Sequence, residues 1–421
     1  MARSLRQARQ VGRHPLRRTS AIMTSMSAII GTGLVAGPAT AVTGAAECLL
    51  PRTDAHHSEG VDTWNDDYVR PERELDALMV FLSFPDWKPF VSPSALVADH
   101  FPATSDFFAR ASYDRFRLRV HPLREWLEMP AASTAYGIQR DWDPGLRTAF
   151  LQDALAAADR RVDFADYDVY YLVADPDAPG VNSDATKVVN FDEPMVLDGA
   201  AVHRVVTVFE QHPPDRYVLA HETGHVFDLP DLYHRPGEGK GDWDTHVGDW
   251  DVMGSQFGLA PDLFGWHKWK LGWLDRWNVA CVAGESGTTR YALRALGAPL
   301  EPGRRDTRLL VLRTGPYEAL ALEGRAPAGN DAGVCTGGVL LYRVRSDTAS
   351  ADGPVEVLDG HPRTSDCLRR SVYPPLADAP LREGETYVTE DGGGIRIRIG
   401  EGGPGDGGWQ VRVTRGPEAL E

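Results

Sequence analysis

The stretch His221-Glu222-Thr223-Gly224-His225 constrains this chain most, because it places two histidines four positions apart with a glutamate beside the first. Residues four apart share one face of a helix, so both imidazoles can reach a single metal ion. Glu222 then lies over the open coordination position, which is the arrangement that a zinc hydrolase requires. Apolar residues flank the motif, and a buried His–Glu–His set without a partner would be costly. The sequence therefore predicts a zinc site on a buried helix, with a solvated surface helix as the alternative.

A third ligand is expected beyond the helix, at Asp231, ten positions after His221. A straight helix would not return that position to the face of the two histidines. Pro230 disfavours helical backbone at the residue before it, so a turn there could bring Asp231 to the metal. Two histidines and one carboxylate leave a fourth position for water, as in catalytic zinc sites. The rival third ligands are His234, Asp228 and Glu238.

The stretch 248–254 (GDWDVMG) holds Met253 between a valine and a glycine. Met253 is either an ordinary core residue or part of a turn that places its thioether beneath the metal site. Four acids, Asp242, Asp244, Asp249 and Asp251, lie close by without the spacing of a calcium loop. We expect them to be solvated or to support the histidine ligands, and Ca²⁺ remains an alternative.

The residues 221–233, the stretch 248–254 and the stretch 266–274 (WHKWKLGWL) together resemble the M6 family, the immune inhibitor A-like secreted bacterial metallopeptidases. Weaker similarity lies at 78–86 and 112–116, so the resemblance covers roughly 75–275 and extends less clearly to about 345. It implies a metzincin-like zinc endopeptidase with ligands at His221, His225 and Asp231, Glu222 as general base and Met253 in the methionine turn. The family usually has glycine where this chain has Asp228. Aspartate is among the few other residues that tolerate left-handed backbone.

Residues 1–46 have the organisation of a secretory signal peptide. Six arginines and no acid occupy 1–20, and 21–46 carries no charge and ends in small residues. Glycine, proline and threonine break the apolar run, which disfavours a membrane anchor. Removing this segment takes the formal net charge from −16 to about −22. So acidic a surface repels nucleic acid and anionic membranes and suits a secreted, extracellular protein.

The four cysteines, Cys48, Cys281, Cys335 and Cys367, are compatible with two disulfides in an exported chain. Cys335–Cys367 is the first expected pair, because both residues lie late in the chain. The alternative for Cys48 is a thiolate that caps the zinc in a latent form. Residues 47–73 are polar and irregular, and they are expected to form a short leader.

Residues 74–277 are predicted to form the catalytic domain, with Asp215 as the cap of the motif helix. Strands are expected near 78–82, 113–120, 167–174 and 202–209, with a helix at 146–158. From about 278 to 421, helical periodicity gives way to short alternating strands separated by glycine and proline, which is typical of a β-sandwich. Strands are expected there at 308–313, 317–323, 339–344, 395–399 and 409–413.

The sequence thus predicts an α+β metzincin-like zinc-peptidase domain followed by a β-sandwich-like domain. The expected activity is cleavage of protein or peptide substrates by metal-activated water, with Glu222 as base and Tyr233 or His246 stabilising the oxyanion. Two alternatives stay open. One is a non-catalytic secreted binding protein that zinc stabilises, and the other is a metallohydrolase that acts on non-peptide substrates.

Overall fold

A computed structural model describes residues 45–56, 59–215, 217–236, 241–284, 286–301, 303–403 and 408–420. The signal peptide expected at 1–46 lies outside these residues except for Ala45 and Ala46. From Val42 to Glu421 the chain forms one compact unit. The domain boundaries expected at 73 and 277 fall inside this unit and stay predictions.

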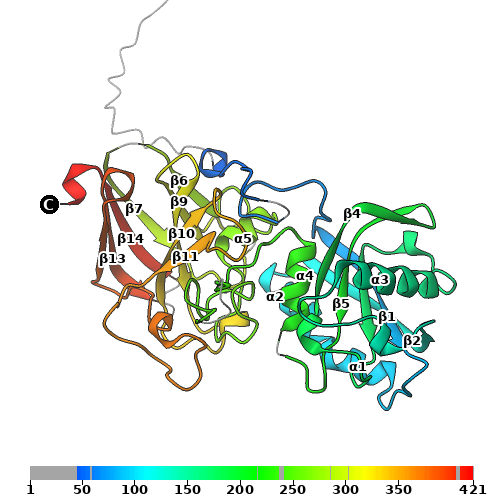
Figure 1. Cartoon of the computed structure of the whole chain (residues 1–421). Helices are drawn as coiled ribbons and strands as arrows, with labels where there is room; N and C mark the ends of the chain where they lie inside the picture. Colours follow the sequence, from blue (N-terminus) through cyan, green and yellow to red (C-terminus); the bar gives the residue numbers. More distant parts are fainter. Residues whose placement is uncertain are drawn as a thin grey trace, which may run out of the picture. The chain divides into compact units, whose positions relative to one another are not determined.

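A five-stranded sheet of order β2-β1-β3-β5-β4 forms the first half of the unit (Figure 1). All neighbours are parallel except β4, an antiparallel edge strand paired with β5. The apolar runs of the central strands suit burial on both faces, as a parallel sheet requires. The strands are β1 (Arg73–Ser83), β2 (Phe116–Glu128), β3 (Val169–Ala174), β4 (Lys187–Leu197) and β5 (Ala200–Val208).

Helices cover both faces of this sheet. One face packs on α3 (Pro144–Ala158), and the other packs on α2 (Ala103–Ala111) and the motif helix α4 (Val218–Val226). α1 (Pro93–His100) precedes α2, and the short α5 (Gly265–Lys270) follows α4. The predicted strands and helix of this half are confirmed, with one exception. Tyr113 and Asp114 have φ near +60°, so the second strand begins only at Phe116.

Two further sheets form the second half. One has the order β11-β10-β9-β8-β6 and the other has the order β12-β13-β14-β7. Their facing side chains share one apolar core, with leucines from β8, β9 and β10 against isoleucines and valines from β13 and β14. This confirms the β-rich region predicted from the alternating pattern. The strands are β6 (Val279–Val282), β7 (Gly287–Leu293), β8 (Leu309–Arg313), β9 (Glu318–Arg325), β10 (Gly338–Arg345), β11 (Val355–Leu358), β12 (Thr386–Thr389), β13 (Ile395–Gly403) and β14 (Gly408–Arg415).

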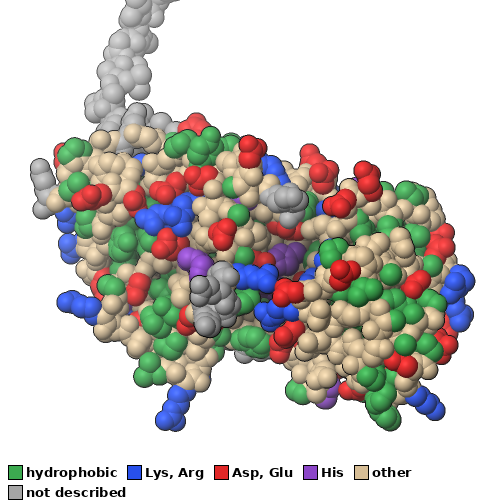
Figure 2. All heavy atoms as spheres, viewed as in Figure 1, with side chains coloured by type: hydrophobic (Ala, Val, Ile, Leu, Met, Phe, Trp, Pro, Cys, Tyr) green, Lys and Arg blue, Asp and Glu red, His purple; other side chains and the backbone are tan. Residues whose placement is uncertain are grey.

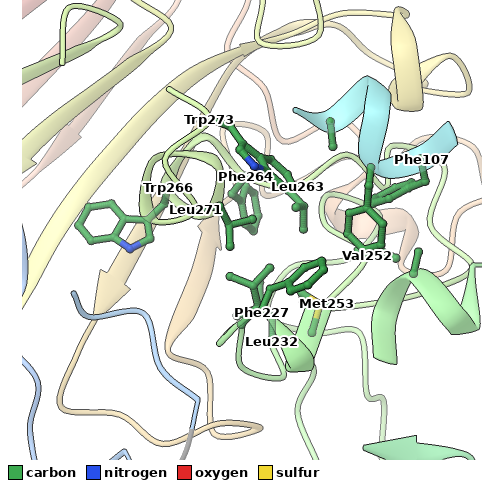
Figure 3. Close-up of a cluster of buried hydrophobic side chains, with 14 of the residues drawn as sticks. Phe107, Phe227, Leu232, Val252, Met253, Leu263, Phe264, Trp266, Leu271 and Trp273 are labelled. Carbon is green, nitrogen blue, oxygen red and sulfur yellow. The ribbon is translucent and has the colours of Figure 1, made fainter. Parts of the chain in front are cut away.

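The core around the motif helix is continuous with the first β-rich sheet. The second face of that sheet, which includes Val311 and Tyr342, belongs to the same buried cluster as α4 and α5. In Figure 3, Phe227, Leu232 and Met253 lie close together beside the motif segment. The two halves are therefore joined by packed side chains rather than by a linker.

The segment expected to be a polar leader is irregular but packed into this core. Cys48, Leu50 and Val61 are fully buried, and Cys48 forms a disulfide with Cys281 on β6. The thiolate-cap alternative for Cys48 is therefore wrong. Cys335–Cys367 forms the second disulfide, as expected. Such bonds are typical of oxidising compartments.

No helix among the described residues is both long enough and apolar enough to cross a membrane.

Candidate metal centre

The motif helix α4 is short and carries its three functional side chains on buried or half-buried positions. His221 and Glu222 are buried, and His225 is half-buried. The helix begins at Val218, after Tyr217 at the cap position with φ +62°. The prediction that Asp215 caps the helix is therefore wrong. Its carbonyl accepts the Val218 N–H instead (3.2 Å), and its side chain accepts a hydrogen bond from Gln256.

The chain leaves the helix earlier than Pro230 would require. α4 ends at Val226, and Asp228 takes φ +61°, the left-handed conformation expected for this position. The Leu229 N–H donates to the Gly224 carbonyl (3.1 Å) and closes the helix end. This tight turn reverses the chain and brings Asp231 back towards the two histidines.

The ligand atoms of His221, His225 and Asp231 all lie within 4.8 Å of one another. Asp231 Oδ1 is 3.3 Å from His221 Nε2 and 3.1 Å from His225 Nε2. Asp231 Oδ2 accepts a hydrogen bond from the Tyr233 hydroxyl (3.0 Å), whereas the buried Oδ1 accepts none. One oxygen is therefore held by the Tyr233 hydroxyl, and the other faces the two imidazole rings.

Backbone carbonyls fix the orientation of both imidazoles. His221 Nδ1 lies 2.8 Å from the Val252 carbonyl, and His225 Nδ1 lies 2.8 Å from the Leu229 carbonyl. A carbonyl only accepts, so each Nδ1 carries a hydrogen, and when a ring is neutral its Nε2 lone pair faces the centre. Two Nε2 atoms and one carboxylate oxygen, each oriented by a second partner, form the donor set that zinc favours.

Charge within the site favours a cation as well. Burial lowers the pKa of His225, but the carboxylates of Asp231 and Glu222 raise it more, to about 10. Burial raises the pKa of Asp231, but the two histidines outweigh this effect and lower it. In the absence of a metal ion, this group therefore holds protons, and a divalent cation would replace them.

Two of the three rival ligands, Asp228 and His234, have other partners. The buried carboxylate of Asp228 pairs with Lys270 Nζ at 2.7 Å, and the His234 ring faces His246 with centroids 5.1 Å apart. Glu238 lies outside the described residues. Within the described part of the chain, only His221, His225 and Asp231 form a group of three or more His, Cys, Asp or Glu side chains able to hold a metal ion.

Of the four nearby aspartates, Asp242 is exposed, whereas Asp249 and Asp251 are buried and bond to loop groups rather than to the two histidines of the motif. Asp251 accepts hydrogen bonds from the backbone of Met253 and Phe264 and lies 3.0 Å from His267 Nδ1. Asp249 accepts from the Leu259 N–H (3.1 Å) and other loop groups. These carboxylates hold loops in place, and the calcium alternative stays untested.

Met253 lies in a turn against the motif helix and is also part of the core, so both interpretations of this residue fit its position. It is fully buried, and a Cβ added to Gly224 would come within 2.3 Å of its sulfur. The Met253 carbonyl also accepts the Leu232 N–H (3.0 Å), next to the third ligand. Gly224 is therefore required for this close approach, and Met253 supports both the helix and the turn that follows it.

Glu222 lies at the wall of an open cleft of about 580 Å³. Its Oε2 accepts the backbone N–H of Val188 on β4 at 2.9 Å. Burial raises its pKa, while the two histidines act in the opposite direction. Figure 2 shows histidine side chains in a recess with both basic and acidic side chains around it. The cleft is lined by residues that include His221, Glu222, His225, Asp231, Tyr233, Lys187, Arg140, Arg235, Glu59, Glu210 and Ser350.

Of the two residues expected to stabilise an oxyanion, Tyr233 lines the cleft. The His246 ring packs against Gly353, where an added Cβ would lie 3.0 Å from the ring. Three contacts to the site were not predicted from the sequence: those of Val188, Lys270 and Ser350. Only Lys270 offered a signal, as one of two lysines within the tryptophan-rich stretch 266–274.

No family model matches this chain, and no curated protein matches it. The resemblance to the M6 metallopeptidases stays a prediction from the motifs.

Proposed function

We propose that this protein is a secreted zinc-dependent endopeptidase of the M6-like, metzincin-like type. The observation that carries the proposal is the convergence of His221, His225 and Asp231 beside Glu222 in an open cleft. A structural zinc site closes all four coordination positions with protein ligands and has no use for a fifth, acidic side chain. Three ligands and an adjacent carboxylate fit a catalytic centre better.

His221, His225 and Asp231 would hold the ion, which supplies Lewis acidity that polarises a carbonyl and acidifies water. Glu222 is the general base: it takes a proton from the attacking water and delivers it to the leaving nitrogen as the C–N bond breaks. The Val188 N–H holds one oxygen of this carboxylate. The other oxygen remains to receive the proton. Tyr233 fixes the orientation of Asp231 through the hydroxyl hydrogen bond to Oδ2.

The position of β4 favours a peptide as substrate. β4 is the edge strand of its sheet, and Val188 donates its N–H away from β5 towards Glu222. The free edge of this strand therefore runs along the cleft. An extended peptide can add to such an edge through main-chain hydrogen bonds, which places its backbone beside the base. A non-peptide substrate would gain nothing from this edge.

Extracellular location is part of the proposal. Both disulfides suit an oxidising compartment. The basic, then uncharged, N-terminal sequence is consistent with export.

The test is digestion of casein by the purified chain, with bound zinc measured in the same samples and 1,10-phenanthroline as inhibitor. We expect about one zinc per chain and chelator-sensitive cleavage. Glu222→Gln should retain zinc and lose about 10²- to 10⁴-fold in kcat, which is the usual contribution of a general base. Glu125→Gln, the same change on the exposed face of β2, serves as the control.

Each alternative gives a distinct outcome. Zinc binding without cleavage of casein or a peptide library would favour the binding protein. Hydrolysis of esters but not of peptides would favour the non-peptide hydrolase. Cleavage by Glu222→Gln at the parental rate would show that Glu222 is not the base.

A further inference from the structure

The connection between β10 and β11, residues 346–354, reaches from the β-rich half to the metal centre. Ser350, near its middle, lines the cleft together with His221, His225 and Asp231. Nothing in the sequence of this connection resembles a metal-binding or catalytic motif. Its role is evident only from its contacts.

Both backbone polar groups of Asp231 are bonded to this connection. The Asp231 N–H donates to Ser350 Oγ at 2.9 Å, and the Asp231 carbonyl accepts the Ala351 N–H at 3.0 Å. The pairing continues along the chain, because the Arg235 N–H donates to the Ala351 carbonyl (3.2 Å) and His234 bridges to Asp352. Residues 231–235 thus run beside 350–352 as a short irregular ribbon.

Asp231 needs such a partner because its own segment contains no regular structure. α4 ends at Val226, and no helix or strand includes residues 227–236. A ligand on a free loop would have to be ordered at the moment the metal binds, which lowers affinity. The two backbone hydrogen bonds, one on each side of the Asp231 Cα, fix the position of the backbone from which the carboxylate projects. The Tyr233 hydroxyl then fixes the orientation of the carboxylate by donating a hydrogen bond to Oδ2.

The connection is itself anchored firmly. β10 is an interior strand of its sheet, and the Arg345 N–H donates to the Pro354 carbonyl (2.8 Å) to close the hairpin. Gly353 has φ +82° and lies under the His246 ring, where an added Cβ would make a tight contact of 3.0 Å. The Val357 N–H donates to the His246 carbonyl (2.8 Å). The position of Ser350 is therefore set by the β-rich sheet.

We infer that Ser350 is a positioning residue for the metal ligand Asp231, and that the β-rich half completes the metal centre. The inference depends on the ligand set of the proposed function but not on the chemistry of peptide cleavage. It gives the C-terminal half a role that differs from substrate binding: this half supplies the fixed partner against which the third ligand is aligned.

The test compares zinc affinity in Ser350→Ala, Ser350→Thr and Thr348→Ala, using the full chain and competition with a chromophoric chelator. Loss of a partner that orients a metal ligand typically weakens binding about 10- to 100-fold. We expect a loss of this size in Ser350→Ala and recovery to within about threefold of the parent in Ser350→Thr, which keeps the hydroxyl. Thr348→Ala removes a hydroxyl from the same connection and should bind zinc as the parent does.

Two measurements separate positioning from general destabilisation. The melting temperature of the metal-free Ser350→Ala chain should equal that of the parent. The visible spectrum of its Co²⁺ form should shift, because the geometry of the Asp231 ligand changes. A zinc Kd within twofold of the parent, or an equal loss in Thr348→Ala, would overturn the inference. So would a parental chain that binds no zinc. If the parent binds zinc but cleaves no peptide, the proposed function fails while the positioning role is still measured.

Discussion

The ion pair between Asp228 and Lys270 lies deep in the molecule and links the turn that follows α4 to α5. Lys270 Nζ is 2.7 Å from Asp228 Oδ2, and the two side chains are 3% and 0% exposed. Asp228 also accepts the Asn65 N–H (3.1 Å), and Lys270 also donates to the Gly60 carbonyl. Replacing Lys270 with methionine would keep the packing of the stem but leave a buried carboxylate without its cation.

The cost of that change follows from burial. Removing one partner of a buried ion pair typically costs about 3 to 5 kcal/mol, because the remaining charge stays desolvated. With an unfolding entropy of about 2.1 cal/mol/K per residue, a unit of about 380 residues (Val42–Glu421) should lose roughly 4 to 6 °C in Tm. Lys88→Met, on an exposed lysine, should change stability by no more than about 0.5 kcal/mol.

The pH dependence gives an independent check. Burial already raises the pKa of Asp228 to about 6 although Lys270 opposes the shift, so in Lys270→Met it should rise further. When the pKa of a carboxyl is higher in the folded protein than its unfolded value of about 3.9, the protein loses stability as pH rises through the folded pKa. The defect of Lys270→Met should therefore be smaller at pH 5 than at pH 8.

The assay is urea unfolding of the parent, Lys270→Met, Asp228→Asn and the double variant at both pH values. Asparagine tolerates the left-handed backbone of position 228 and leaves no charge, so the double variant should recover most of the loss. A loss below about 1 kcal/mol in Lys270→Met, or a double variant no more stable than Lys270→Met, would refute the reasoning.

Two further predictions concern packing and pH. Gly224→Ala places a Cβ within 2.3 Å of the Met253 sulfur. Overpacking of this kind costs about 1 to 3 kcal/mol. We expect urea unfolding to show this loss of stability and zinc titration to show weaker binding. Burial lowers the pKa of His100 to about 4, while Asp99 acts weakly against it. The contribution of His100 to the free energy of unfolding should be fully present above pH 6.5. It should fall by up to about 3 kcal/mol as pH drops to 4, because His100 binds a proton in the unfolded chain before it does so in the folded chain. His100→Gln should flatten unfolding curves over this range, and an unchanged slope would exclude His100 as the cause.

Local patterns predicted much of the fold. Apolar runs predicted β1 and β3, because both faces of these strands are buried. Strict alternation predicted β13 and β14, because only one face of each strand packs into the core. The burial of the segment 47–73, expected to be a polar leader, was not predictable for a physical reason. Its burial depends on a few residues, above all Cys48, Leu50 and Val61, and these are spaced too irregularly to form a pattern. The disulfide to Cys281 and contacts with α5 hold it in the core.

The two histidines and Glu222 were predictable because one helix turn sets their spacing. Asp231 was predictable only by its ligand type, since no periodicity connects it to the helix. The residues that fix Asp231 were not predictable. Ser350 is separated from it by 119 positions, and the hydrogen bond uses a backbone N–H and a common serine.

The contacts at position 228 explain why the turn between His225 and Asp231 carries aspartate. Its φ of +61° admits glycine, asparagine or aspartate at low cost. Glycine would satisfy the backbone but would leave the Lys270 ammonium buried with only a carbonyl partner. Aspartate tolerates the backbone conformation and also pairs with the Lys270 ammonium. Its carboxylate accepts the Asn65 N–H as well, which links the 45–73 segment to the turn. The turn is thus held at Asp228 by the N-terminal segment and α5, and at Asp231 by Ser350. A turn fixed from two directions by distant parts of the chain does not need a longer helix to place Asp231.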